Sequence, residues 1–104
     1  MDAQDRVAAF AAEHDLEAEP AYRVLDLVAE VGEIAADAAK STAYGAEPGA
    51  LDIAEDELGD ALFSLLLVAD AVDVDAEAAL ETALSKYERR VAETGDAGSD
   101  GQSR

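Results

Sequence analysis

The fold of this 104-residue chain is decided by residues 57–68, which read Glu57-Leu58-Gly59-Asp60-Ala61-Leu62-Phe63-Ser64-Leu65-Leu66-Leu67-Val68. The stretch contains no proline and is rich in strong helix formers, so it predicts a helix. At about 100° per residue, its large apolar side chains point in nearly all directions around the axis. A helix that is apolar all round is buried, often between subunits. We therefore expect a buried central helix, with Asp60 at the edge of its core.

Helical patterns extend over almost all of the remaining sequence. The expected helices cover about residues 2–14, 20–42, 50–71 and 76–93. Pro20 suits the first turn of the second helix, and Tyr44-Gly45 ends it. Asp73-Val74-Asp75 is expected to form a turn and the N-cap of the fourth helix. Four helices with short connections predict an all-α fold, a four-helix antiparallel bundle. Residues 1–93 form one domain in this interpretation, and residues 94–104 form a flexible acidic Gly-Ser tail.

The charge balance excludes several classes of function. The chain carries 25 Asp and Glu against 7 Lys and Arg, a net charge of −18, and has no cysteine. Disulfides, thiolate metal sites and cysteine nucleophiles are therefore excluded, and binding to a nucleic-acid backbone is disfavoured. The apolar runs are far shorter than the roughly 20 residues of a membrane span, and no secretion signal opens the sequence, so we expect a cytoplasmic protein.

The acidity also bears on the solvent in which the protein works. Half of the chain is apolar, so the composition is not that of a disordered protein. A dense carboxylate surface over a patterned core resembles proteins of salt-accumulating cells, where a Debye length of about 3 Å screens surface repulsion. A generic acidic bacterial protein is the alternative.

Two pairs of carboxylates stand out against this acidic background. Glu30 and Glu33 are three residues apart on the second helix, and Glu57 and Asp60 repeat this spacing on the third. Like charges at this spacing repel, so a cation would stabilise them. Oxygen ligands without His or Cys suit Mg²⁺, Mn²⁺ or Ca²⁺. The alternative is a solvated acidic face, and spacing alone does not decide between the two.

Three segments together resemble a known family. Glu30-Val31-Gly32-Glu33-Ile34 and Glu57-Leu58-Gly59-Asp60-Ala61-Leu62-Phe63, followed by Lys86-Tyr87-Glu88-Arg89-Arg90, are similar to the motifs of MazG-like nucleotide pyrophosphohydrolases. These enzymes belong to the all-α nucleoside triphosphate pyrophosphatase superfamily. The resemblance covers about residues 21–91. It implies a helical bundle completed by oligomerisation, as a homodimer or homotetramer.

The resemblance also implies a reaction. Relatives hydrolyse nucleoside triphosphates between the α and β phosphates, and Mg²⁺, for which Mn²⁺ can substitute, is bound by the motif acids. The corresponding ligands here are Glu30, Glu33, Glu57 and Asp60. One glutamate of the second helix, Glu30 or Glu33, would act as general base.

Other residues receive roles with less specific support. Lys86 is expected to hold phosphate oxygens together with Arg89 or Arg90, the alternative being a cation cluster near a helix C-terminus. Phe10, His14 and Tyr44 are weak candidates for holding the base. Leu84 stands where many relatives carry Asn, which puts any contact made by that Asn in doubt.

Two other functions remain open at this point. A phosphoribosyl-ATP pyrophosphohydrolase-like enzyme shares the superfamily, and a non-catalytic helical module for metal binding or oligomerisation would also fit the helices. The acids outside the four motif positions are interpreted as solvated, among them Asp26, Asp37, Glu55 and Asp56.

Overall fold

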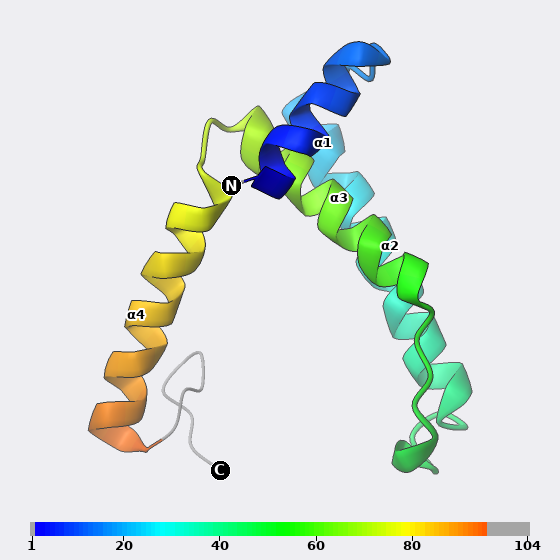
Figure 1. Ribbon diagram of the computed structural model, residues 1–104. Coiled ribbons are helices and arrows are strands. Elements are labelled where there is room, and N and C mark those ends of the chain that lie inside the picture. The colour runs from blue at the N-terminus through cyan, green and yellow to red at the C-terminus, as the bar shows by residue number, and fades with distance from the viewer. Residues whose placement is uncertain (1, 96–104) are drawn as a thin grey trace.

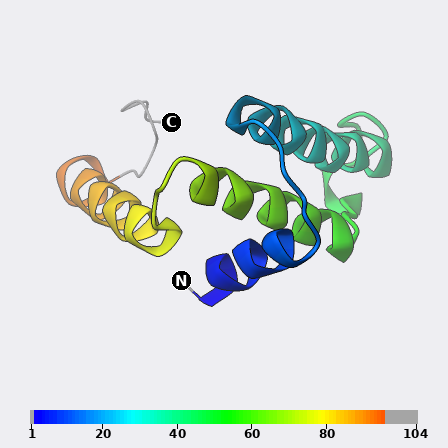
Figure 2. The same cartoon turned by 90° about the horizontal axis from the view of Figure 1, so that it is seen from above.

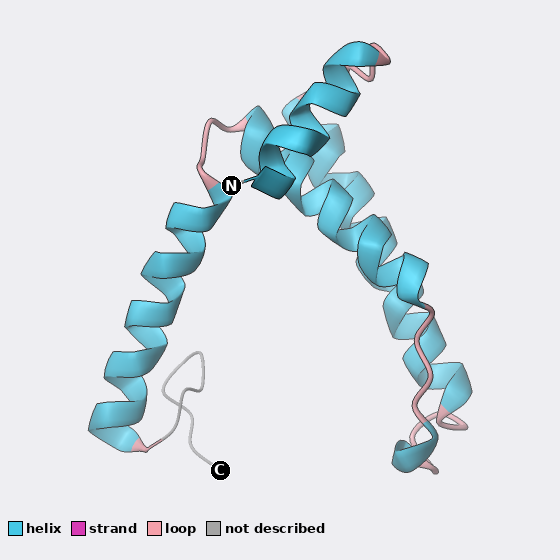
Figure 3. Ribbon diagram, viewed as in Figure 1, coloured by secondary structure: helices cyan, strands magenta, loops and turns pink. Residues whose placement is uncertain are grey.

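A computed structural model describes residues 2–95, and every regular element within them is a helix (Figures 1 and 3). The elements are α1 (Asp2–Glu13), α2 (Pro20–Ser41), the short 3-10 helix η1 (Pro48–Ala50), α3 (Glu55–Ala71) and α4 (Ala76–Thr94). The predicted all-α class with four α-helices is confirmed. Of the expected tail, Thr94 ends α4 and Gly95 follows it with a φ of 75°, while residues 96–104 lie outside the described part.

An antiparallel pair, α2 and α3, forms the centre of the molecule. The connection between them is tied back to the end of α2, because the Asp52 N–H donates to Ser41 Oγ at 2.9 Å and the Ala54 N–H donates to Asp37 Oδ2 at 3.4 Å. These bonds hold residues 51–54 outside the helix. The third helix therefore begins at Glu55, five residues later than the sequence indicates.

Helix α1 packs on α3 away from α2, so that α3 lies between the two other helices (Figure 2). The Phe10 ring meets Phe63 edge-on, with 6.1 Å between ring centroids. Buried Gln4 bridges to the α3–α4 corner, donating from Nε2 to the Val74 carbonyl at 2.8 Å and accepting from the Ala76 N–H at 2.7 Å. The most buried apolar side chains, Leu66 and Leu67, belong to α3, as the sequence predicts for this helix.

Helix α4 starts at a well-formed cap and then leaves the other helices. Asp75, in the predicted turn and cap region, accepts from the backbone N–H groups of Glu77 at 2.9 Å and Ala78 at 3.1 Å. Over residues 2–95, α4 packs extensively against none of the other helices, and it projects from the end of α3 (Figure 1). One chain therefore holds three helices together and leaves the fourth to stand apart.

Apolar side chains remain on the outside of this arrangement. Leu58, Leu62 and Leu65 of α3 are each about half exposed, and so are Leu80 and Leu84 of α4. The sequence predicts that α3 is buried on all sides, but a single chain covers only part of its surface. The expected oligomer stays a prediction. Among the described helices, none has the length and apolar character needed to cross a bilayer.

Candidate metal centre

The four motif carboxylates lie along the seam between α2 and α3. Because the two helices are antiparallel, Glu30 of α2 comes opposite Asp60 of α3. Removal from water raises the pKa of the Glu30 carboxyl, and the negative charges of Glu33 and Asp60 raise it further. Asp26, one turn earlier on α2, acts in the same direction. The structure therefore brings the two sequence motifs together.

At the other end of the seam, Glu57 faces Asp37 and Glu33. Removal from water raises the pKa of Glu57, and the carboxylates of Asp37 and Glu33 raise it as well. Asp37 can hydrogen-bond Glu57 only when one of the two carboxyl groups carries a proton. Oε1 of Glu57 is buried and meets no donor within residues 2–95. A buried carboxylate oxygen without a donor is costly, so this position favours a proton or a bound cation.

Asp37 is the acid whose surroundings the sequence interpretation missed. It was grouped with the solvated acids, but the structure places it half-buried against Glu57 and the Ala54 N–H. The signal was present in the sequence. Asp37 falls within the same arc of about 60° as Asp26, Glu30 and Glu33 on one helix face. The shared arc indicates that Asp37 lies on the same helix face as the motif glutamates, and the packing of α3 on α2 places it beside Glu57.

The residues fit a hard divalent cation by the chemistry of their donors. All are carboxylate oxygens, and Oε1 of Glu57 is an orphaned buried acceptor. In the described part of the chain, no group of three or more acidic or histidine side chains converges closely enough to share one ion. The seam thus supplies the ligand type and the negative charge, without a preassembled coordination shell.

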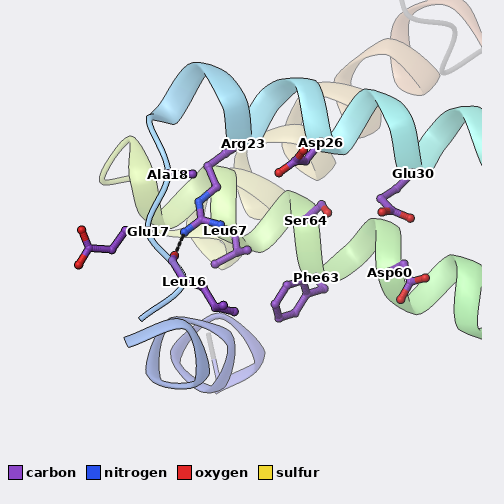
Figure 4. A pocket seen from close by; sticks show the side chains of 10 residues that line it. All are labelled: Leu16, Glu17, Ala18, Arg23, Asp26, Glu30, Asp60, Phe63, Ser64 and Leu67. Carbon is purple, nitrogen blue, oxygen red and sulfur yellow. Dashed lines mark hydrogen bonds between the residues drawn. The ribbon is translucent and has the colours of Figure 1, made fainter. Parts of the chain in front are cut away.

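A pocket of about 420 Å³ opens from this seam between α2 and α3 (Figure 4). Glu30 and Asp60 line one end, and Asp26 lies between this end and Arg23. Arg23 lies at the other end, beside the connector between α1 and α2. The wall between these ends is formed by Phe63, Ser64 and Leu67 of α3. Neither Arg23 nor Phe63 has a predicted role in the site from the sequence alone.

The basic segment of α4 stands away from the carboxylates of its own chain. Lys86 Nζ lies 4.9 Å from the centroid of the Tyr87 ring, and the Arg90 guanidinium carbon lies 5.7 Å from the same centroid. Both cations therefore border the face of one aromatic ring. Since α4 projects from the α2–α3 pair, one chain does not join Lys86, Arg89 and Arg90 to the acidic seam (Figure 1).

The three weak base-binding candidates lie outside the pocket. The Phe10 and His14 rings contact each other in a tilted arrangement, with 4.4 Å between centroids, and Phe10 also contacts the Phe63 ring. Tyr44 follows the C-terminal end of α2, where its side chain is 81% exposed. Its φ of 56° belongs to a left-handed turn that reverses the chain.

Comparison with known proteins identifies the segment that contains the seam. A family model described as the MazG nucleotide pyrophosphohydrolase domain matches residues 20–94, which span α2 to α4. The match leaves α1 outside. No curated protein and no solved structure shows significant similarity to the chain.

Proposed function

Since the chain belongs to the MazG nucleotide pyrophosphohydrolase family, we propose that it hydrolyses nucleoside triphosphates between the α and β phosphates in nucleotide-pool housecleaning. Water attacks the α phosphorus, the bond to the bridging oxygen breaks, and nucleoside monophosphate and pyrophosphate leave. Family membership supports a nucleotide pyrophosphohydrolase in general. The observation that carries the finer proposal is the seam, where Glu30 and Glu33 face Glu57 and Asp60 across two antiparallel helices.

The same four carboxylates would hold Mg²⁺, with Mn²⁺ as a substitute. A bound divalent cation would offset the negative charge of the triphosphate and lower the pKa of the attacking water. The buried, donorless Oε1 of Glu57 supports this assignment, because an acidic seam without a cation would leave that oxygen uncompensated. Either Glu30 or Glu33 would accept the proton of the water.

The cations of α4 complete the site in this proposal. Lys86, with Arg89 or Arg90, would bind phosphate oxygens and stabilise the departing pyrophosphate. Because α4 projects away from the seam of its own chain, these side chains would contact the seam of a second copy in a homodimer or homotetramer. The half-exposed leucines of α3 and α4 support such an assembly, since together they form apolar surface that one chain leaves uncovered.

Pyrophosphate release from a panel of nucleotides tests the proposal. The assay is run in molar salt and in dilute buffer, with and without Mg²⁺, and the panel includes phosphoribosyl-ATP. Asp60→Asn removes a seam carboxylate and should abolish release. Asp70→Asn, an exposed acid on the same helix, is the matched control and should retain it.

Two outcomes would replace the proposal with one of its alternatives. Turnover confined to phosphoribosyl-ATP would indicate an enzyme of that type. Binding of Mg²⁺ without turnover of any nucleotide would indicate a non-catalytic helical module.

A further inference from the structure

Within residues 2–95, Arg23 is a cation without an ion-pair partner, although the chain is strongly acidic. It shares a pocket with Asp26, Glu30 and Asp60, and Asp26 is only one helical turn away. Its Nη2 nevertheless donates to the Leu16 carbonyl (Figure 4), and within residues 2–95 the structure gives it no ion pair. A guanidinium carries five N–H donors in a rigid fork, so this single bond leaves most of the fork available inside the pocket.

The position of Arg23 indicates which part of a nucleotide it would meet. Seven residues of α2 separate it from Glu30, which is about 10 Å along the helix axis. On the α3 side, Phe63 and Leu67 form the wall between them, with the Ser64 hydroxyl beside them, and Asp26 lies on the α2 side. A polyphosphate lying there would exchange water for aromatic and aliphatic surface, which is costly for a charged group. A nucleobase is flat, apolar on its faces and polar at its edges, and suits this wall.

We propose that this end of the pocket binds the nucleobase, with Phe63 against its face and the Arg23 fork reading its edge. The inference rests on the proposed function, which places the α phosphate at the carboxylate end. A guanidinium fork pairs with two adjacent acceptor atoms, as in its contact with O6 and N7 of guanine. Cytosine also presents adjacent acceptors, at O2 and N3. Adenine, uracil and thymine have no such pair, so guanine and cytosine nucleotides are the preferred class.

The aromatic side chains of α1 act through Phe63 in this arrangement. Phe10 meets the Phe63 ring edge-on, with 82° between the ring planes, and the His14 ring contacts Phe10 at a tilt of 46°. Phe10 and His14 are therefore positioning residues that fix the orientation of the Phe63 ring. This gives α1 a part in base recognition although it lies outside the matched domain.

The first test measures binding of the products, separately from catalysis. Affinities for GMP, CMP, AMP, UMP and pyrophosphate are measured by calorimetry with Mg²⁺ present. Wild-type protein should bind GMP and CMP more tightly than AMP and UMP. Arg23→Gln should erase about tenfold or more of that preference and leave pyrophosphate affinity unchanged. Phe63→Leu should weaken all four monophosphates to a similar extent, because stacking tolerates any base.

Two further variants separate base reading from charge. Arg23→Lys keeps the positive charge but loses the fork, so the preference for GMP and CMP should stay lost. Lys40→Gln, which makes the same charge change at an exposed site on α2, should behave as wild type. If Arg23→Gln weakens pyrophosphate and all monophosphates alike and Arg23→Lys restores them, Arg23 binds phosphate and the inference is overturned.

Pyrophosphate release by the same variants distinguishes the two proposals. If wild-type protein releases pyrophosphate while Arg23→Gln and Phe63→Leu match it on every nucleotide, the base site is wrong and the proposed function stands. If wild-type protein turns over no nucleotide but its GMP and CMP preference depends on Arg23, the proposed function fails and the base site stands.

Discussion

The α2–α3 pair carries the four motif carboxylates, whereas α4 carries the clustered cations Lys86, Arg89 and Arg90, and the two regions pack in different ways. The α2–α3 pair makes its main contacts within itself. Its connection is hydrogen-bonded to Asp37 and Ser41, and its carboxylates face one another across the seam. Helix α4 contains this cation cluster, and over residues 2–95 it packs extensively on none of the other helices. The anionic half of the proposed site is thus complete within one chain, whereas the cationic half is presented outward.

This difference indicates which parts of the molecule need contact with a second chain. A seam of carboxylates is stable only with something positive nearby, and a lone helix with half-exposed leucines is stable only with a partner. A second copy supplies both needs at once if its α4 lies over the seam.

Among changes in α4, the largest effect is expected from removing one of its cations. Lys86→Ala should lower kcat about 10²- to 10³-fold, because loss of one preorganised donor to a developing negative charge has that magnitude. Steady-state kinetics of pyrophosphate release measure it. Circular dichroism should show unchanged helix content, since the Lys86 ammonium lies beside Tyr87 and not in the core. Wild-type kinetics in this variant would remove Lys86 from the site.

Mixing two inactive variants should restore activity if α4 serves a second chain. Asp60→Asn disables the seam and Lys86→Ala disables α4. Half of randomly mixed dimers contain one chain of each kind and carry one intact site of two, so about a quarter of wild-type activity should return. The mixture is refolded together and assayed against each variant alone. Failure to recover any activity would mean that both halves of the site come from the same chain.

Much of the fold follows from the sequence because helical signals are local. The apolar run after Asp60, the proline at the start of α2 and the Asp75 cap each act within a few residues, and all are found where expected. The start of α3 is less predictable, since it depends on Ser41 and Asp37 reaching residues far along the chain. Side-chain hydrogen bonds between residues so far apart do not appear in the periodic pattern of apolar and polar residues in the sequence.

The site follows from the sequence in the same uneven way. Motif spacing identifies Glu30, Glu33, Glu57 and Asp60, since residues three apart share a helix face. It does not reveal Arg23, because a single arginine one turn before Asp26 looks like an ordinary i,i+3 ion pair. Only the packing of α3 against α2 shows that its side chain turns into a pocket with Phe63 and bonds the Leu16 carbonyl instead.

A moderate loss of stability is expected from a substitution of Gln4, which holds the corner between α3 and α4. Gln4→Leu removes the amide that bonds the Val74 carbonyl and the Ala76 N–H, and leaves both backbone groups short of a partner. Unfolding in urea should show a loss of about 1–3 kcal/mol. Asp5→Ala, an exposed change on the same helix, is the control and should stay within about 0.5 kcal/mol of wild type. Equal stability of both variants would mean that Gln4 does not secure the corner.

The smallest effect concerns the cap at which α4 begins. The backbone N–H groups of Ala78 and Glu77 hold the pKa of Asp75 below its ordinary value of 3.8. A lowered pKa means that the folded state favours the ionised cap. Its stabilisation is therefore complete above pH 3.8 and is lost as the pH falls through the folded-state pKa. Asp75→Ala should be less stable than wild type at pH 7, and urea unfolding should show the gap narrowing at pH 3. Asp75→Asn retains an uncharged cap, so its difference from Asp75→Ala should not change with pH. A gap between wild type and Asp75→Ala that is constant down to pH 3 would assign the stabilisation to hydrogen bonding alone, without a contribution from the charge of the cap.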